Sequence, residues 1–425
     1  MKQFRNLSAT VVLDGTPSSI QRATSGKWTG TILADARRIN ITEQSDVRFK
    51  LNKAEEKADK EEKKKAEKEA KDKKDDPKPT GQAGEEPVTA DTDETGPSPD
   101  RDDFEDEDDL SDLMKDSRPL RGLDQIGPGV YMTYHGKEDS SGSVSAETIV
   151  FVRNEKTKQE KDLWKKAKIK EKDAKDANSF AKMKVGSKEY KVLPEEEVQE
   201  YVNRLGQSLV PEYQKHLLDE DDNKIPFRFA VVYEKSLNAS CYPTGTMVIN
   251  HELFNQLENE AQLVFILSHE IAHATQEHIV REMNHNRKRR KGLFIASIVT
   301  AGMGYNNISS LLKYSLVVMQ MGYARTTENQ ADRMGLSNMI YHGYDPREAP
   351  RTWKLFSLLG EDGPQTFLSD HDSNTERRSF LWMTIHNTYP TLDFAAMKRD
   401  SDDFHRISEI VRQKYPSKLK KGKAA

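Results

Sequence analysis

A chain of 425 residues is longer than one average domain, but with 35% hydrophobic and 32% charged residues it is too polar to be packed along its whole length. Its 66 basic and 70 acidic residues nearly cancel, which excludes the global basic field of a nucleic-acid-binding protein. The single cysteine, Cys241, excludes an intrachain disulfide and a cysteine-rich metal site. A bound metal would therefore need histidine and carboxylate ligands.

Neither a signal peptide nor a membrane span is expected. The first residues are followed by polar and β-prone residues instead of an apolar segment of the secretory type. The longest apolar run, between Gly292 and Met303, is well short of the ~20 residues that a membrane-spanning helix needs. We therefore expect a soluble protein, for which peripheral membrane contact stays possible.

The N-terminal part is expected to contain two β-rich segments, residues 1–52 and 118–153, on either side of a charged low-complexity linker at 53–117. In the first segment, Gly30–Ala34 has the β-branched pattern of a strand between turn residues. The linker is rich in Lys, Glu and Asp with no apolar face to bury, which predicts disorder. It is either a solvated spacer or an interaction tail. A charged helical connector should follow at 154–185.

The packed domain is expected over residues 186–412, with a basic tail at 413–425. Two strands, Phe227–Tyr233 and Thr246–Ile249, are predicted near its start, with the turn Pro243–Gly245 before the second. We expect them to pair in a small antiparallel sheet ahead of a run of helices. The first helix is predicted from five apolar residues that recur at helical spacing, namely Val198, Tyr201, Val202, Leu205 and Leu209.

The apolar helical run Leu263–His273 carries two histidines four residues apart. At 3.6 residues per turn His269 and His273 leave the same face and can bind one metal ion, while Glu270 lies about 100° around the helix. Zinc lowers the pKa of water toward ~7, and an adjacent carboxylate can then accept a proton as water attacks a peptide carbonyl. The pattern therefore favours a catalytic zinc site over two surface or capping histidines.

A third ligand is required, because catalytic zinc usually takes three protein ligands plus water. His278 lies five residues after His273, which does not fit the six-residue spacing of a third histidine ligand, and we expect it to cap the helix end. Glu328 and Asp332 share one helical face at i and i+4. Such a pair can supply a carboxylate ligand and a second carboxylate that holds a ligand histidine, although alone it is more often a solvated face.

Together these motifs resemble metallopeptidase family 48, the gluzincins that include HtpX heat-shock, CAAX prenyl and BepA-like peptidases, over roughly Leu193–Ile385. Besides the two motif helices, the resemblance rests on Tyr201–Gly206, on Asn238-Ala239 and on Ser369–Arg377, which contains His371. It implies an α+β fold, with a mainly helical gluzincin zinc-peptidase domain and a small antiparallel sheet. The β-rich module and the disordered charged insert precede that domain.

By this resemblance one zinc ion per chain is bound by His269, His273 and Glu328. Glu270 is then the general base of peptide hydrolysis, and Asp332 supports a ligand histidine.

Four further residues are implied by the same resemblance. Arg377 would contact the carboxylates of the site or form a surface pair, and His371 would act close to the zinc as a transition-state or gating residue. Asn238 and Ala239 would bind substrate beside the strand Thr246–Ile249, whose free edge could hold an extended chain by strand addition.

The expected function is that of a zinc-dependent metalloendopeptidase acting on unfolded or flexible polypeptides, with no nucleic-acid partner. The alternative is an envelope-associated scaffold or chaperone-like binding protein with a gated or inactive zinc site. Between the motif helices, Leu293–Met303 and Leu311–Met321 are expected to form a helical lid, with membrane apposition as the other interpretation. The family resemblance suggests the cell envelope or periplasm, and the oligomeric state is left open.

Overall fold

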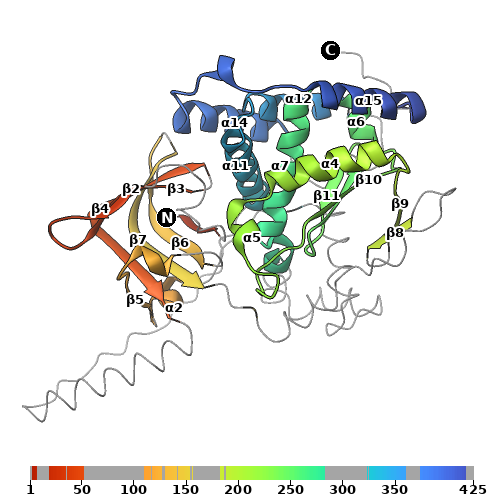
Figure 1. Ribbon diagram of the computed structural model, residues 1–425. Coiled ribbons are helices and arrows are strands. Elements are labelled where there is room, and N and C mark those ends of the chain that lie inside the picture. The colour runs from red at the N-terminus through yellow and green to blue at the C-terminus, as the bar shows by residue number, and fades with distance from the viewer. Residues whose placement is uncertain are drawn as a thin grey trace, which may run out of the picture.

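The chain folds into a β-rich part, built from residues before 154, and a mainly helical part, built from residues after 181 (Figure 1). Helices and sheets are both present in this computed structural model, in agreement with the predicted α+β class. No helix among the described residues is both long and apolar enough to cross a membrane. The described residues are 2–6, 19–34, 36–51, 110–115, 117–126, 130–140, 142–153, 156, 182–185, 188–282, 323, 325–359 and 374–417.

The β-rich part is one mixed sheet with the strand order β1-β6-β7-β4-β3-β2, and β5 pairs with the end of β4. The long strand β4 pairs with β3 in the antiparallel sense and with β7 in the parallel sense. Two strands from after the charged insert, β6 and β7, therefore lie between β1 and β4 from before it in a single sheet. The strands are β1 (Lys2–Asn6), β2 (Ser19–Arg22), β3 (Trp28–Ala34), β4 (Arg37–Lys50), β5 (Ser117–Pro119), β6 (Val130–Glu138) and β7 (Val144–Arg153).

The alternation of buried and more exposed residues along β4 is the pattern expected of a strand with one face in the core. Ile39, Ile41, Val47 and Phe49 are buried at every second position on each side of an irregularity in its pairing with β7. These residues pack into one core with β3, β6 and β7.

Two segment predictions need correction. The linker was expected to reach residue 117, but α2 (Leu110–Lys115) already packs there, with Leu113 buried. The connector was expected to be helical to residue 185, but β8 (Lys182–Val185) pairs with β9 (Lys188–Lys191) as a hairpin. Each place contains a buried apolar residue, Leu113 in α2 and Val185 in β8.

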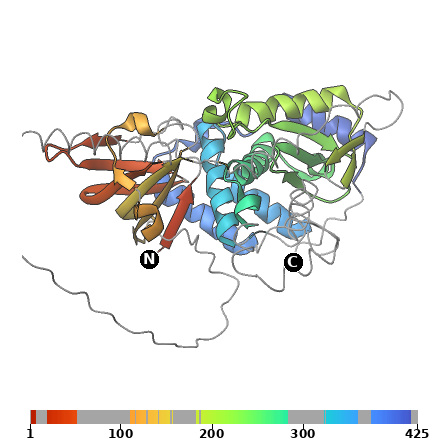
Figure 2. The ribbon, with the colours of Figure 1, turned by 90° about the horizontal axis from the view of Figure 1, so that it is seen from below.

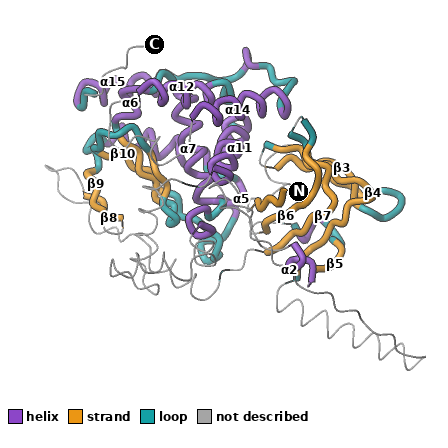
Figure 3. Tube along the Cα trace, turned by 180° about the vertical axis from the view of Figure 1, so that it is seen from behind, coloured by secondary structure: helices purple, strands orange, loops and turns teal. Residues whose placement is uncertain are grey.

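The helical part surrounds a central helix, α7 (Figures 2 and 3). All 16 residues of α7 are buried, and the helix packs against α4, α11, α12 and β11. The elements are α4 (Glu196–Leu209), α5 (Glu212–His216), β10 (Arg228–Val232), β11 (Ala239–Cys241), β12 (Thr246–Asn250), α6 (Glu252–Gln256), α7 (Glu260–Thr275), α11 (Arg325–Tyr341), α12 (Glu348–Leu359), α14 (Asn374–Thr388) and α15 (Asp402–Lys414), with short 3-10 turns at Leu123–Gln125 and Phe394–Ala396.

Helix α4 lies against β10, as its sequence requires. The five apolar residues that predicted this helix are all buried. Contact is close at Gly206, because a Cβ there would lie 2.4 Å from the ring of Phe229 on β10.

The small sheet of the helical part is mixed, so the predicted antiparallel sheet is wrong in one pairing. Its order is β10-β12-β11, in which β12 runs parallel to β10 and antiparallel to β11. The chain reverses twice between β10 and β12, because β11 intervenes. The turn around Gly245, which has a φ of 81°, joins β11 to β12.

This order also corrects the expected binding edge. Strand β12 is flanked on both sides, so the predicted free edge at Thr246–Ile249 does not exist. Within the described part of the chain, the outer edge belongs to β11.

The N-terminal end of α7 is tied to distant segments through the buried carboxylate of Glu260. Tyr201 donates to it at 2.9 Å, Tyr344 at 2.7 Å and Lys398 at 2.5 Å, and the hydroxyl of Ser401 is a fourth donor. Burial favours the neutral acid, but these donors, led by Lys398, hold the pKa of Glu260 below its ordinary value. The carboxylate thus joins α4, α7 and the segment before α15.

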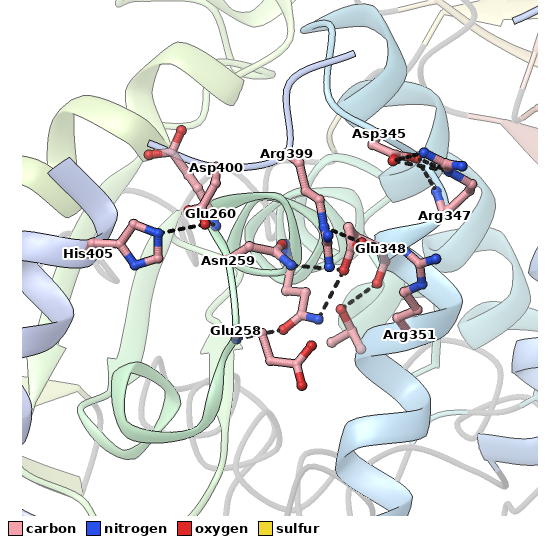
Figure 4. A network of polar contacts seen from close by, with 12 residues as sticks. Glu258, Asn259, Glu260, Asp345, Arg347, Glu348, Arg351, Arg399, Asp400 and His405 are labelled. Atoms are coloured by element: carbon pink, nitrogen blue, oxygen red, sulfur yellow. Dashed lines mark hydrogen bonds and ion pairs between the residues drawn. The ribbon is translucent and has the colours of Figure 1, made fainter. Parts of the chain in front are cut away.

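A second carboxylate, that of Glu348 on α12, completes this anchoring (Figure 4). It accepts from Asn259 at 3.0 Å and from Gln262 at 3.1 Å, and Arg399 lies 2.8 Å from it. Since Asn259 also caps α7 by accepting from the backbone N–H of Gln262, one network fixes the start of the helix and its neighbour α12.

Helix α11 crosses close to α7 at Gly335. A Cβ at this position would lie 3.1 Å from the backbone N and 3.2 Å from the Cα of His269. A side-chain carbon here would be closer than most Cβ contacts, and the obstacle is helix backbone and not a movable side chain.

We predict that Glu260→Gln lowers the free energy of unfolding at pH 7 by about 2–4 kcal/mol, because Lys398 loses its charged partner. The folded-state pKa lies below the ordinary value of 4.5, so this stabilisation is complete above pH 4.5 and is lost as the pH falls through the folded pKa. Denaturant unfolding from pH 7 to pH 3 should therefore show the two proteins converging in acid. Glu258→Gln, at an exposed position two residues away, should unfold like the wild type, and a constant gap at all pH values would contradict the prediction.

We also predict that Gly335→Ala separates α11 from α7. Overpacking should cost about 1–3 kcal/mol, partly offset by ~1 kcal/mol of helix propensity. The expected result is a net loss of stability together with weaker binding of zinc, measured by calorimetry and by chelator competition. Gly206→Ala is the matched control, because it should lower stability through Phe229 without changing zinc affinity. Wild-type affinity in Gly335→Ala would refute the proposed spacing role.

Candidate metal centre

Three buried side chains from two helices converge at the middle of the helical part. Helix α7 supplies His269 and His273, and α11 supplies Glu328. The Nε2 atoms of the histidines are 3.0 Å apart, the His269 Nε2 atom is 3.5 Å from Glu328 Oε2, and the His273 Nε2 atom is 3.5 Å from Glu328 Oε1. The close crossing at Gly335 brings the two helices within this range.

These separations fit a zinc ion. Ligands that surround zinc tetrahedrally at 2.0–2.1 Å are about 3.3 Å from one another. Here the two Nε2 atoms are 3.0 Å apart, and each lies 3.5 Å from a different oxygen of the Glu328 carboxylate. Two imidazoles and a carboxylate are also the donor set of a zinc site that keeps a fourth position for water. The residues present therefore fit the metal that the sequence predicts.

Asp332 and Arg377 contact the candidate ligands: Asp332 lies beside His269, and Arg377 lies beside Glu328. The Asp332 carboxylate lies 3.1 Å from His269 Nδ1 and accepts two hydrogen bonds of 2.7 Å from the guanidinium of Arg377. Arg377 also approaches Glu328 Oε2 to 3.0 Å and stacks 3.9 Å over the ring of Trp353. It is 2% exposed, so it forms no surface pair.

The charged side chains of this group shift one another's pKa values. Burial alone would lower the pKa of His269, but Asp332 and Glu328 raise it to about 9. Burial alone would raise the pKa of Asp332, but Arg377 and His269 hold it below its ordinary value. Asp332 is therefore an ionised acceptor for the ring N–H of His269, which leaves Nε2 directed at the site.

Glu270 is held by the edge strand. Its Oε2 atom accepts the backbone N–H of Cys241 at 2.9 Å, and its side chain is buried beside the ligands. Cys241 is buried, and burial raises the pKa of its thiol well above the ordinary value. The thiol is thus neutral, while its backbone positions the carboxylate.

Asn238 and Ala239 lie where β11 begins, beside Glu270. The carbonyl of Asn238 accepts from Asn250 N at 3.0 Å, so its backbone already belongs to the sheet. The N–H of Tyr242 likewise donates to Thr246 O. Because the N–H and C=O groups of successive residues point to opposite sides of a strand, those of Ala239 and Cys241 point away from β12. Of the two predicted substrate residues, Ala239 is the one whose backbone faces outward.

Sequence reasoning missed the environment of His273. His278 does not cap the helix as expected, because its Nδ1 atom lies 2.9 Å from Nδ1 of His273. The ring of Tyr323 stacks on His273 with centroids 4.1 Å apart. Burial lowers the pKa of His278 to about 4, so its ring is neutral. His278 was visible in the sequence but was considered only as a metal ligand or a helix cap, and no local sequence pattern pointed to Tyr323.

Two predicted features cannot be placed. His371 lies outside the described residues, and so do the segments 293–303 and 311–321, where a lid was expected. The structure describes the neighbouring Arg377 on α14, which it brings to the centre.

Comparison with known proteins identifies this part of the chain. The mitochondrial metalloendopeptidase OMA1 of Arabidopsis thaliana is 28% identical over 157 residues, which cover 37% of this chain and 31% of that protein. The beta-barrel assembly-enhancing protease of Escherichia coli K12 is 28% identical over 157 residues, covering 36% and 31%. The mitochondrial metalloendopeptidase OMA1 of Bos taurus is 29% identical over 161 residues, covering 36% and 31%.

The matched part spans about a third of the length of these curated relatives. A family model, described as Peptidase family M48, matches residues 196–385. This match begins with α4 and ends within α14, so it contains both motif helices and leaves out the N-terminal sheet. Residues 196–385 of this chain therefore resemble the peptidases of family M48.

Proposed function

We propose that this chain is a zinc-dependent metalloendopeptidase that cleaves peptide bonds in unfolded or flexible proteins. The observation that carries the proposal is the buried His269–His273–Glu328 cluster, in which the two Nε2 atoms are 3.0 Å apart and each lies 3.5 Å from a different oxygen of Glu328. The match of residues 196–385 to a peptidase family model supports the same chemistry. His269, His273 and Glu328 would hold the ion.

When bound, zinc supplies Lewis-acid chemistry that lowers the pKa of water from about 15.7 toward ~7. Glu270 accepts the proton of the attacking water and returns it to the leaving amine. Its Oε2 atom is engaged by the Cys241 N–H, so we assign the proton transfer to Oε1. The anchoring by β11 keeps this carboxylate beside the scissile bond.

The same edge of β11 would bind the substrate. The N–H and C=O of Ala239 point away from β12, but the residue is only 1% exposed, so its cover must move aside before an extended chain can pair there, with the next peptide bond near Glu270. In a segment that belongs to a folded helix or sheet, the backbone N–H and C=O groups are already hydrogen-bonded within the protein. The site therefore suits unfolded or flexible segments.

The decisive experiment compares wild type with Glu270→Gln. We expect the variant to bind one zinc per chain like the wild type but to cleave a fluorescently labelled unfolded protein at least 10²-fold more slowly, because the proton acceptor is gone. Zinc content is measured by elemental analysis and cleavage by fluorescence, with chelator-treated protein and Glu258→Gln as controls. If wild type holds zinc and cleaves nothing, the scaffold alternative replaces the peptidase. If wild type binds no zinc, the metal site itself is wrong.

We predict that Ala239→Pro weakens substrate binding without loss of zinc. Proline removes an N–H that faces away from β12, so the sheet should tolerate it while the substrate loses one hydrogen bond, worth up to about tenfold in kcat/KM, mainly through KM. Ser240→Pro is the control, because that N–H faces β12 and its loss should lower the melting temperature instead. Unchanged KM in folded Ala239→Pro would exclude strand addition at β11.

A further inference from the structure

A row of hydrogen-bonding groups runs behind His273, on the side away from the metal centre. Arg281 Nη1 lies 3.2 Å from Gln330 Oε1, and His278 Nε2 lies 3.1 Å from the same oxygen. His278 Nδ1 then lies 2.9 Å from His273 Nδ1. The row therefore connects α11, the turn after α7 and a candidate zinc ligand.

Proton positions along this row follow from its ends. A guanidinium can only donate, so the atom of Gln330 that faces Arg281 must be the carbonyl oxygen. That oxygen accepts from His278 Nε2–H, which leaves Nδ1 of the neutral ring as an acceptor. His273 must then carry its proton on Nδ1. Its Nε2 atom keeps a lone pair, and this atom faces His269 and Glu328.

A break in the helix makes this contact possible. In a continuous helix, residues five apart lie about 140° apart around the axis, so His278 could not reach His273. Glu277 has a φ of 52°, which ends α7 and turns the chain back. Lys156, from the segment after β7, lies 3.3 Å from the Glu277 carboxylate in a largely buried ion pair. This pair holds the turn that presents His278.

We propose that His278 is a positioning residue that fixes the Nδ1–H tautomer and the orientation of His273, so that Nε2 is available to the metal. The inference rests on the proposed zinc site. His269 is oriented by the carboxylate of Asp332, and His273 by a neutral imidazole backed by the Gln330 amide. The two ligands of one helix are thus held by different chemistry.

The test measures zinc affinity by chelator competition for two substitutions at this position. His278→Leu removes the acceptor and should weaken zinc binding 10–100-fold, the usual effect of losing a group that orients a metal ligand. His278→Asn places a carbonyl oxygen near the position of Nδ1 and should retain affinity within about threefold of wild type. Melting temperatures of the metal-free proteins are measured alongside.

His251→Leu is the matched control. His251 is buried to the same degree as His278, and its ring also accepts a hydrogen bond, from Glu234 N at 3.2 Å, but it lies away from the centre. This substitution should lower the melting temperature and leave zinc affinity unchanged. If His278→Leu does not fold, Gln330→Leu and Gln330→Glu take its place, with weakened binding expected only for leucine.

The outcomes separate this inference from the proposed function. Wild type without zinc would overturn the metal site, and with it the inference. Zinc-binding wild type together with an equally tight His278→Leu would overturn only the role of His278. The inference is also wrong if His278→Asn fails like leucine, or if His251→Leu loses as much affinity, because the effect would then be general damage to the core.

Discussion

The complete burial of α7 is the constraint on which the rest of the helical part depends. A helix with no solvated face must provide a partner for every polar side chain it carries, because an unpaired buried group costs about 1–3 kcal/mol and a charged one more. Four donors surround Glu260 at its start, drawn from elements far apart in the sequence. Near its end, His269, Glu270 and His273 meet groups from β11 and α11. The surrounding elements are therefore arranged by the polar residues of one apolar helix as much as by its hydrophobic ones.

Charge explains why a cation suits this centre. The carboxylates of Glu270, Glu328 and Asp332 lie near one buried guanidinium, that of Arg377, so the formal charges of these four side chains sum to −2. Burying unbalanced charge is costly, and a divalent cation between the two histidines and Glu328 would balance it. Arg377 cannot do so alone, because its planar group is committed to Asp332 through two hydrogen bonds. The same commitment gives Asp332 the ionised state it needs to orient His269.

The sequence was informative wherever local spacing determines geometry. Helical periodicity placed the buried face of α4, and the spacing of four residues placed His269 beside His273 and Glu328 beside Asp332. Prediction from the sequence failed where the structure depends on tertiary topology. Parallel pairing of β10 and β12 could not be read from a turn signal that belongs to β11. His278 was judged by its distance along an ideal helix, whereas the positive φ of Glu277, a residue with no strong preference for that conformation, changed the direction of the chain. Tyr323 contacts His273 from 50 residues further along the sequence, and no local sequence pattern predicts such a contact.

The close crossing at Gly335 gives the second motif helix a signature that can be sought in other sequences. Ligand, supporting carboxylate and glycine stand at positions 0, 4 and 7, which two turns of helix place along one line. A glutamate with an aspartate four residues on is common on solvated helices and carries little information alone. Adding a residue without a side chain at the seventh position selects for a helix that must lie against another backbone. When a chain contains a histidine helix but several acidic candidates for its missing partner, this three-point pattern would discriminate among them by spacing alone.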